Sequence, residues 1–385
     1  MKHSIVSKIR RFNPWIYANE IDMEPNEFQS GEVVAVFSKK DGFLATAYVN
    51  PKCTIFARIL SFGKEEIGKK FFHNRIKKAI ARREGLAKQT NAMRLIHSEA
   101  DFLPGLIVDK YGDALAIQIN TAGMESYREL IISTLKHFLN PSWIVEKSDE
   151  HSREIEGITS RNGTIFGTPI PEFELIENGV KFLVDIEDAQ KTGFYLDQRK
   201  NRLLCASYIK PEDKVLDLCS NAGGFGIHAL KQGAKEAVFV DASESAIAQT
   251  RANLAHNELI SEALHVSDVF SFLKEQKYKN SFDMVIIDPP SFAKTKEQAT
   301  GAKRGFKYLL MESAKAVKNG GLIGLFSCSH HIGRRELLEI VLDVSHDLKV
   351  QFIVLEQMQQ DADHPALLNA SASLYLNGLL LKVEK

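Results

Sequence analysis

The chain has 385 residues, of which 44% are hydrophobic and 25% charged, and its formal net charge is zero. Such a chain can fill the cores of two or three domains, and its overall charge says nothing about a nucleic-acid partner. The four cysteines contain no C-x-x-C pair, and no apolar run reaches the ~20 residues of a membrane span. The first residues, MKHSIVSKIRRF, are basic but no apolar h-region follows them, so we do not expect a signal peptide. A zinc ribbon and a disulfide framework are excluded, and we expect a cytoplasmic protein without a metal site.

Residues 1–70 alternate between apolar and polar side chains with a period of two. The segments GEVVAVFS, FLATAYV and TIFARILSF predict strands, joined by turns at residues 40–42 and 50–52. We expect a small β-barrel or a partly open sheet, with basic and aromatic side chains near its start.

A basic segment follows at residues 64–94, where ten Lys or Arg residues stand against three Glu. FFHNRIKKAIARREGL predicts a helix with one apolar face. A solvated helix face is the simpler interpretation of this charge, but the local excess in a neutral chain also suits contact with phosphates.

Residues 95–185 predict an α/β region without obvious chemistry. Two strands flank a turn at residues 110–113, a helix covers 125–139, WIVEKS is a strand, and a hairpin turns at residues 177–179. We find neither paired acids nor a histidine cluster, so a spacer or substrate-positioning domain is expected.

Residues 186–385 alternate strand and helix throughout. Seven predicted strands interleaved with helices indicate a doubly wound sheet. The segment FKYLLMESAKAVKNG predicts a helix that ends at a capping Gly320.

The stretch Lys214–Asp241 combines a buried strand, a glycine turn, a helix and a second strand that ends in an acid. This arrangement is typical of a nucleoside site. The turn reads N-A-G-G-F-G, and Asp217 precedes it on the strand. A carboxylate there would repel a pyrophosphate but attract an ammonium, which favours S-adenosylmethionine over NAD. Asp241 suits ribose recognition, and Asp268 either faces the adenine or caps a helix.

Two further motifs close neighbouring strands at the same edge of the predicted sheet. DPPSF places Asp288 before two prolines, and SCSHH brings Cys328 out of a buried strand. A thiolate there could add to C6 of cytosine, so that C5 can attack a sulfonium methyl group, whereas methylation of an amino group needs no thiol. Cys205 and Cys219 are better explained as buried thiols, and His228 as a packed core histidine.

TGFYLDQR, DLCSNAGGFGIHAL, DPPSFAK and SCSHH, in this order, resemble the ribosomal RNA large subunit methyltransferase I family, which acts on cytosine C5 of 23S rRNA. FNPWIYANEI and GFLATAYVNPKCTIFARIL resemble the PUA domain of that family, and DFLPGLIVDKYGD resembles the start of its central domain. The resemblance covers essentially the whole chain. It implies a PUA-like RNA-binding domain at 1–70, a central α/β domain at 71–185, and a Rossmann-like class I methyltransferase domain at 186–385.

The resemblance also assigns roles. Cys328 is the expected nucleophile, and Asp288 is expected to steady the cytosine beside the cofactor. The expected S-adenosylmethionine site consists of Tyr195, Gln198, Asp217, Ser220, Asn221, Gly223, Gly224, Phe225, Asp241, Asp268 and Asp288. Better-known RNA cytosine-5 methyltransferases carry a second cysteine after the prolines, but this chain has Ser291 there. The base that takes the C5 proton is therefore not identified.

The expected partner is 23S rRNA, naked or in a partly assembled large subunit. The predicted RNA contacts are Arg10, Arg11, Trp15, Lys70, Arg75, Lys78 and Arg82. Two alternatives remain open: an amino-group RNA methyltransferase that uses the DPPSF loop, and a noncatalytic RNA-binding assembly factor. A homodimer is also left open.

Overall fold

The computed structural model describes residues 3–22, 24–170, 172–187, 194–275, 278–292 and 297–385. The chain forms two compact units. Unit 1 comprises Met1–Leu175, Val184–Leu196 and Ala362–Ser373, and unit 2 comprises Ile176–Leu183, Asp197–Asp361 and Leu374–Lys385. The domain boundaries at residues 70 and 185 stay predictions. Among the described residues, no helix is both long and apolar enough to cross a membrane.

The N-terminal part of unit 1 is a four-stranded antiparallel sheet in the order β1-β4-β3-β2, as the period of two predicted. Its inner face packs on a helix, α1, that the alternating pattern did not reveal; Ile5 and Ile9 of this helix are buried in the same core as Ile16 and Phe56. The elements are α1 (His3–Arg10), β1 (Trp15–Tyr17), β2 (Val33–Ser38), β3 (Gly42–Val49) and β4 (Ile55–Ser61).

The rest of unit 1 is built on a five-stranded sheet in the order β5-β6-β7-β8-β9. The apolar faces of α2 and α4 pack on it, with Phe72 and Ile131 fully buried, while the lysines of α2 face outward. The elements are α2 (Lys69–Ala81), β5 (Ala92–His97), β6 (Leu106–Tyr111), β7 (Ala114–Ile119), α3 (Ala122–Glu125), α4 (Arg128–Leu139), β8 (Trp143–Glu146), α5 (Glu150–Glu156) and β9 (Gly163–Gly167). The predicted hairpin at 177–179 is confirmed as β10 (Phe173–Glu177) and β11 (Val180–Val184).

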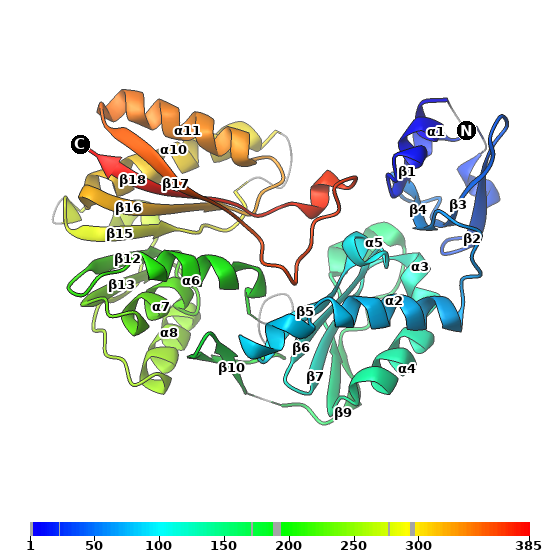
Figure 1. Cartoon of the computed structure of the whole chain (residues 1–385), viewed down its shortest axis with the longest axis horizontal. Coiled ribbons are helices and arrows are strands. Elements are labelled where there is room, and N and C mark those ends of the chain that lie inside the picture. Colours follow the sequence, from blue (N-terminus) through cyan, green and yellow to red (C-terminus); the bar gives the residue numbers. More distant parts are fainter. Residues whose placement is uncertain (1–2, 23, 171, 188–193, 276–277, 293–296) are drawn as a thin grey trace. The chain divides into compact units, whose positions relative to one another are not determined.

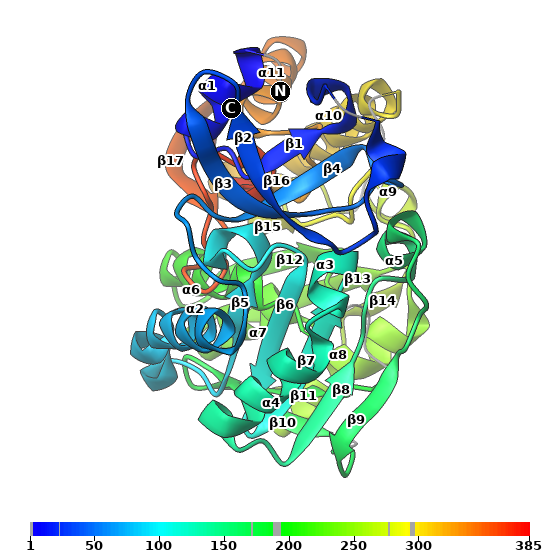
Figure 2. The same ribbon diagram turned by 90° about the vertical axis from the view of Figure 1, so that its right-hand side faces the viewer.

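Unit 2 contains the predicted doubly wound sheet, with seven strands in the order β14-β13-β12-β15-β16-β18-β17. The five strands from β14 to β16 run parallel, while β18 is antiparallel to both β16 and β17. The strands are β12 (Lys214–Leu218), β13 (Glu236–Asp241), β14 (Leu264–Val266), β15 (Phe282–Ile287), β16 (Val317–Ser327), β17 (Gln351–Gln359) and β18 (Asn377–Glu384). Figure 2 shows the same elements from a second direction.

Helices cover both faces of this sheet (Figure 1). One face carries α6 (Arg199–Ser207), α7 (Gly224–Lys231) and α8 (Glu244–His256); the other carries α9 (Val269–Phe272), α10 (Ala299–Ala316) and α11 (Arg334–Leu348). The predicted cap at Gly320 is wrong. Helix α10 already ends at Ala316. Strand β16 begins at Val317, which pairs with Phe282 of β15 instead of continuing the helix.

The connection between β17 and β18 leaves unit 2 and forms part of unit 1 as residues 362–373. Asp363 holds it there: its carboxylate accepts a hydrogen bond from the Arg94 amide at 3.0 Å, and its carbonyl accepts one from Arg83 Nη2 at 2.9 Å. Arg83 is fully buried and forms a two-point ion pair with Asp101. No local sequence pattern predicted this exchange, because all of these contacts join distant parts of the chain.

Candidate active site

A tight turn joins β12 to α7 at the carboxyl edge of the unit 2 sheet. Cys219, Asn221 and Gly223 all have positive φ angles, of 58°, 48° and 80°, which reverses the chain within a few residues. Helix α8 holds the turn from behind: Thr250 Oγ1 donates to the Asn221 carbonyl at 2.7 Å, and Asn253 Nδ2 donates to the Ala222 carbonyl at 2.9 Å. These two positioning residues were not predicted, since nothing local in the α8 sequence marks them.

Gly226 shows why α7 needs a glycine in its first turn. A Cβ atom at this position would lie 2.3 Å from Cε1 of Phe239 on β13, closer than real Cβ contacts. The missing side chain therefore lets α7 approach the sheet directly, which places the free amides of its N-terminus at the edge where ligands bind.

Asp217 lies under this turn and is almost fully buried, with 1% of its surface exposed. Its Oδ2 accepts a hydrogen bond from the Gly226 amide at 2.8 Å. Burial raises the pKa of Asp217 to about 8, and the neighbouring Asp288 and Asp241 add to the rise against the opposing effect of the Gly226 hydrogen bond. The site thus holds a carboxyl group whose ionised form needs a nearby positive charge.

Asp241 is positioned by the turn itself. Its Oδ2 accepts from the Asn221 amide and its Oδ1 from the Ser243 amide, both at 2.9 Å. Both oxygens keep further acceptor capacity toward solvent. Asp268, by contrast, caps α9 by accepting from the Ser271 amide at 3.0 Å. The helix-cap alternative is therefore observed, and a contact between Asp268 and adenine stays a prediction.

Ser220 and Phe225 complete the turn. Ser220 Oγ is buried and has no hydrogen-bond partner among the described residues, so it offers an unused polar atom beside the glycines. Phe225 packs its ring on Phe326 of β16, with centroids 5.1 Å apart. The site therefore suits a ligand that carries an ammonium group and a ribose. The ammonium would pair with the buried Asp217, and the ribose would donate to Asp241 beside the buried hydroxyl of Ser220.

Asp288 and Cys328 follow neighbouring parallel strands at the same edge. Leu218 pairs with Ile287, and Ile287 pairs with Leu325, so the ends of β12, β15 and β16 are in register. Asp288 directly follows β15, and the half-buried Cys328 directly follows β16. Of the DPPSFAK and TGFYLDQR motifs, Ala293, Lys294, Thr192 and Gly193 lie outside the described residues.

Upstream of the turn, Gln198 is buried at the start of α6 and accepts a hydrogen bond from Asn201 at 2.6 Å. Tyr195 is 38% exposed and belongs to unit 1, whereas the other residues of the predicted cofactor site belong to unit 2. The roles of Tyr195 and Gln198 toward the cofactor stay predictions.

A buried polar group behind the turn was missed from the sequence. Arg202 of α6 makes a two-point ion pair with Glu177, at 2.7 and 2.6 Å, and His228 Nε2 lies 2.9 Å from the same carboxylate. Burial alone would raise the pKa of Glu177, but the Arg202 guanidinium, aided by His228, lowers it to about 2. His228 is buried, as predicted, and its ring also lies against Phe182, with centroids 5.9 Å apart.

The predicted RNA-contact residues of unit 1 fall into two groups. Arg10, Arg11, Lys70 and Lys78 are exposed, although Arg10 also pairs with Asp41. Three others contact neighbours in the chain: Trp15 Nε1 donates to Glu99 at 3.0 Å, Arg75 donates to the Leu60 carbonyl at 3.3 Å, and Arg82 pairs with Asp101 at 2.6 Å. Burial also lowers the pKa of Arg75. These three have a structural role whether or not they touch RNA.

The fold and the turn together define a class I S-adenosylmethionine-dependent methyltransferase. Residues 152–371 match the family described as an S-adenosylmethionine-dependent methyltransferase, and residues 1–62 match the family described as a PUA-like domain. The cofactor is accordingly S-adenosylmethionine. Two solved structures share the fold over nearly the whole chain. One, from Streptococcus mutans, is 22% identical with a TM-score of 0.84, and the match covers 99% of this chain and 98% of that one. The other, described as a methyltransferase complexed with SAH, is 24% identical with a TM-score of 0.86, and the match covers 98% of each chain.

Curated relatives narrow the class to one family. A protein named "Ribosomal RNA large subunit methyltransferase I" from Tolumonas auensis is 37% identical over 384 residues, which cover 98% of this chain and 96% of the relative. A protein of the same name from Aeromonas salmonicida is 39% identical over 385 residues, covering 98% and 97%. The chain belongs to the ribosomal RNA large subunit methyltransferase I family, and the predicted family and fold class are confirmed.

Proposed function

We propose that this enzyme forms 5-methylcytosine in 23S rRNA, with Cys328 as the covalent nucleophile. The single observation that carries the proposal is the register of β15 and β16, which brings Asp288 and Cys328 to neighbouring strand ends at the edge that bears the glycine turn. The names of the relatives support large-subunit rRNA as the substrate.

The other three cysteines of the chain are poorly suited to act as nucleophiles. Burial raises the pKa of Cys53 to about 12, and it raises the pKa of the Cys205 thiol as well. Cys219 lies on the same edge as Cys328, but burial together with Asp241 and Asp288 raises the pKa of its thiol. The raised pKa values disfavour the thiolate forms of these three cysteines. The position of Cys328 directly after β16 makes it our candidate for the attacking thiolate.

In the proposed reaction, C6 of cytosine bonds transiently to Cys328 and C5 receives the methyl group. The thiolate of Cys328 adds to C6, which makes C5 nucleophilic, while Asp288 steadies the base. S-Adenosylmethionine, when bound, supplies the methyl group to C5. A general base then removes the C5 proton, the C5–C6 double bond re-forms, and Cys328 leaves as a thiolate. Asp217 and Asp241 would hold the ammonium and ribose ends of the cofactor throughout.

Substitution of Cys328 by Ala tests this chemistry. We expect the variant to bind S-adenosylmethionine as the wild type does but to transfer no methyl group to 23S rRNA, as measured by mass spectrometry of nucleosides. RNA that contains 5-fluorocytidine should form a covalent complex with the wild type only, because the fluorine cannot leave as a proton. Cys53→Ala, which removes a buried thiol of unit 1, is the matched control and should keep full activity.

Two outcomes would replace the proposal. If Cys328→Ala still methylates rRNA and the product is an N-methylated base, the DPPSF loop acts on an amino group. If the wild type binds no S-adenosylmethionine in calorimetry, the chain is a noncatalytic RNA-binding factor. Because the target base must leave its stack to reach the site, we expect naked or partly assembled rRNA to be the better substrate; faster methylation of intact subunits would contradict this.

A further inference from the structure

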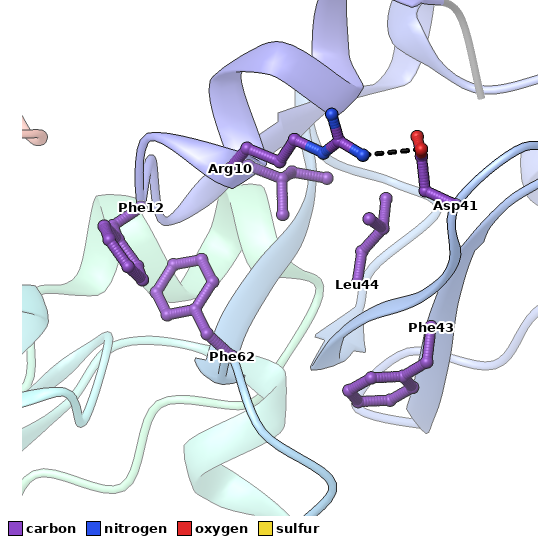
Figure 3. A pocket seen from close by; sticks show the side chains of 7 residues that line it. Arg10, Phe12, Asp41, Phe43, Leu44 and Phe62 are labelled. Atoms are coloured by element: carbon purple, nitrogen blue, oxygen red, sulfur yellow. Dashed lines mark ion pairs between the residues drawn. The ribbon is translucent and has the colours of Figure 1, made fainter.

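The PUA-like part of unit 1 has a pocket between α1, the β2–β3 turn and the residues after β4, which we call the aromatic pocket (Figure 3). Phe12 and Phe62 lie together on one side of it, Phe43 lies on the other, and the Arg10–Asp41 ion pair runs along its edge. The pocket is lined by Ile9, Arg10, Phe12, Asp41, Phe43, Leu44 and Phe62.

Of the three phenylalanines that line this pocket, Phe12 is exposed, and Phe43 and Phe62 are half-buried. Phe12 is 58% exposed and contacts Phe62 edge to face, with ring centroids 5.1 Å apart. Phe37, next to the pocket, is 56% exposed and contacts Phe43 in the same way at 5.8 Å. Edge-to-face pairs leave ring faces available for a flat partner, and two exposed Phe side chains, each in contact with a half-buried one, form an apolar patch that could receive such a partner.

Positive charges surround these rings. The Arg10 side chain is 60% exposed although it pairs with Asp41 at 2.5 Å, and Lys64 Nζ lies 5.6 Å from the centroid of the Phe43 ring. Further exposed cations on the neighbouring segments are Arg11, Lys39 and Lys40. Asp41 is the one acid that lines the pocket in the described structure, and its charge is already compensated.

We propose that the aromatic pocket binds an unpaired nucleotide of the RNA substrate. The base would stack on Phe12, Phe62 or Phe43, and its phosphates would lie near Arg10, Arg11 and Lys64. A paired base cannot offer its face to these rings, so the pocket selects single-stranded RNA. The proposal deepens the proposed function, on which it rests for its RNA partner. It assigns a binding role to Phe12, Phe43 and Phe62, which are not among the RNA contacts predicted from the sequence.

Binding to the full-length protein tests the pocket. The probes are a fluorescent 12-nucleotide single strand without secondary structure and a fully paired RNA duplex, each followed by anisotropy at fixed salt. We expect Phe12→Ala to bind the single strand about tenfold more weakly than the wild type, as loss of one base–aromatic stack predicts, and to bind the duplex unchanged. Phe62→Leu keeps the apolar volume but removes the aromatic face, so it should show the same selective loss.

Phe166→Ala is the matched control. Phe166 is another exposed aromatic residue of unit 1, 37% exposed with Lys136 Nζ at 3.6 Å from its ring centroid, but it lies on β9 and not in the pocket. Its substitution should leave both affinities unchanged. Unaltered single-strand affinity in both pocket variants would overturn the proposal, and so would an equal loss for the duplex. Dissociation of a dimer by Phe12→Ala would show that a second copy of the chain occupies the pocket.

The same assays separate this proposal from the one on catalysis. Binding is measured without S-adenosylmethionine, and the covalent step is measured with Cys328→Ala. If Cys328→Ala stays active while Phe12→Ala loses single-strand affinity, the covalent mechanism fails and the pocket stands. If Cys328→Ala is inactive while both pocket variants bind like the wild type, the pocket fails and the mechanism stands.

Discussion

Asp217 accepts a hydrogen bond from the amide of Gly226 at 2.8 Å, so the buried acid of β12 is tied to the first turn of α7. The bond does not overcome the cost of burial, and the pKa of the carboxyl group stays near 8. In the free enzyme at pH 7 the group is therefore mostly protonated. A bound cation would reverse this, which couples the binding of the cofactor to a proton.

The first prediction concerns this coupling. We expect S-adenosylmethionine binding to release up to one proton from Asp217 near pH 7, because its ammonium lowers the raised pKa. Affinity should then rise as pH increases from 6 toward 8 and level off above the pKa of about 8. Calorimetry in buffers of different ionisation enthalpy measures the released proton. Asp217→Asn keeps the acceptor for Gly226 but cannot ionise, so it should show neither the release nor the rise.

A second prediction concerns Glu177, whose ion pair with Arg202 lies behind the glycine turn. Glu177→Gln removes the carboxylate charge that forms the two-point ion pair with the buried Arg202 and should lower the free energy of unfolding by about 3–5 kcal/mol at pH 7. The pKa of Glu177 is lowered to about 2 in the folded protein. The ionised Glu177 therefore contributes its full share to the free energy of unfolding above the ordinary pKa of 4.5, and this contribution is lost as pH falls toward 2. The difference in the free energy of unfolding between the variant and the wild type should therefore be about 2 kcal/mol smaller at pH 3 than at pH 7.

Urea unfolding at the two pH values checks the second prediction. Glu212→Gln is its control, because Glu212 forms an exposed ion pair with Lys235 at 2.5 Å and its loss should hardly change stability. If Glu177→Gln lowers the free energy of unfolding equally at both pH values, the charge of Glu177 does not stabilise the fold, which contradicts the prediction.

Gly226→Ala should separate α7 from β13. The new methyl group would meet the Phe239 ring at 2.3 Å, so we expect a loss of about 1–3 kcal/mol in stability and weaker cofactor binding as the helix shifts. Thermal unfolding and calorimetry measure the two effects. Gly301→Ala in α10, where a Cβ meets nothing within 4 Å, should be neutral or slightly stabilising. Equal behaviour of the two variants would refute the packing argument.

The fourth prediction concerns the exposed lysines of α2. Lys70→Gln and Lys78→Gln should each weaken binding of every RNA sequence alike and reduce the salt dependence of the affinity, by about 0.7 in the log–log slope for each lost contact to a single strand. Affinity measured over a range of salt concentrations tests this. Lys349→Gln, at the exposed end of α11, is the control and should change neither quantity. If Lys70→Gln and Lys78→Gln leave the salt dependence of the affinity unchanged, as the control does, the lysines of α2 only face solvent and do not contact RNA.

The chemistry-bearing motifs could be predicted from sequence because each is a short segment whose meaning is local. A strand that ends in DPPSF or SCSHH brings its side chains to the carboxyl edge of a parallel sheet wherever that strand is placed. The seven-stranded sheet and the family followed from the same segments and are confirmed. The local pattern failed where long-range pairing competed with it: Val317 pairs with Phe282 of β15, so the helix ends before Gly320.

The sequence alone thus determined the fold class, the cofactor and the order of the glycine turn, Asp288 and Cys328. Only the tertiary structure revealed that Asp217 is buried enough to hold a proton at pH 7, that Glu177 pairs with Arg202 behind the turn, and that three phenylalanines line one pocket with Arg10. The physical reason is that burial and ion pairing depend on which distant segments meet. An Asp or Glu in the sequence does not show whether its carboxyl group will be buried or exposed. Its pKa, and therefore its role, depends on its neighbours in space.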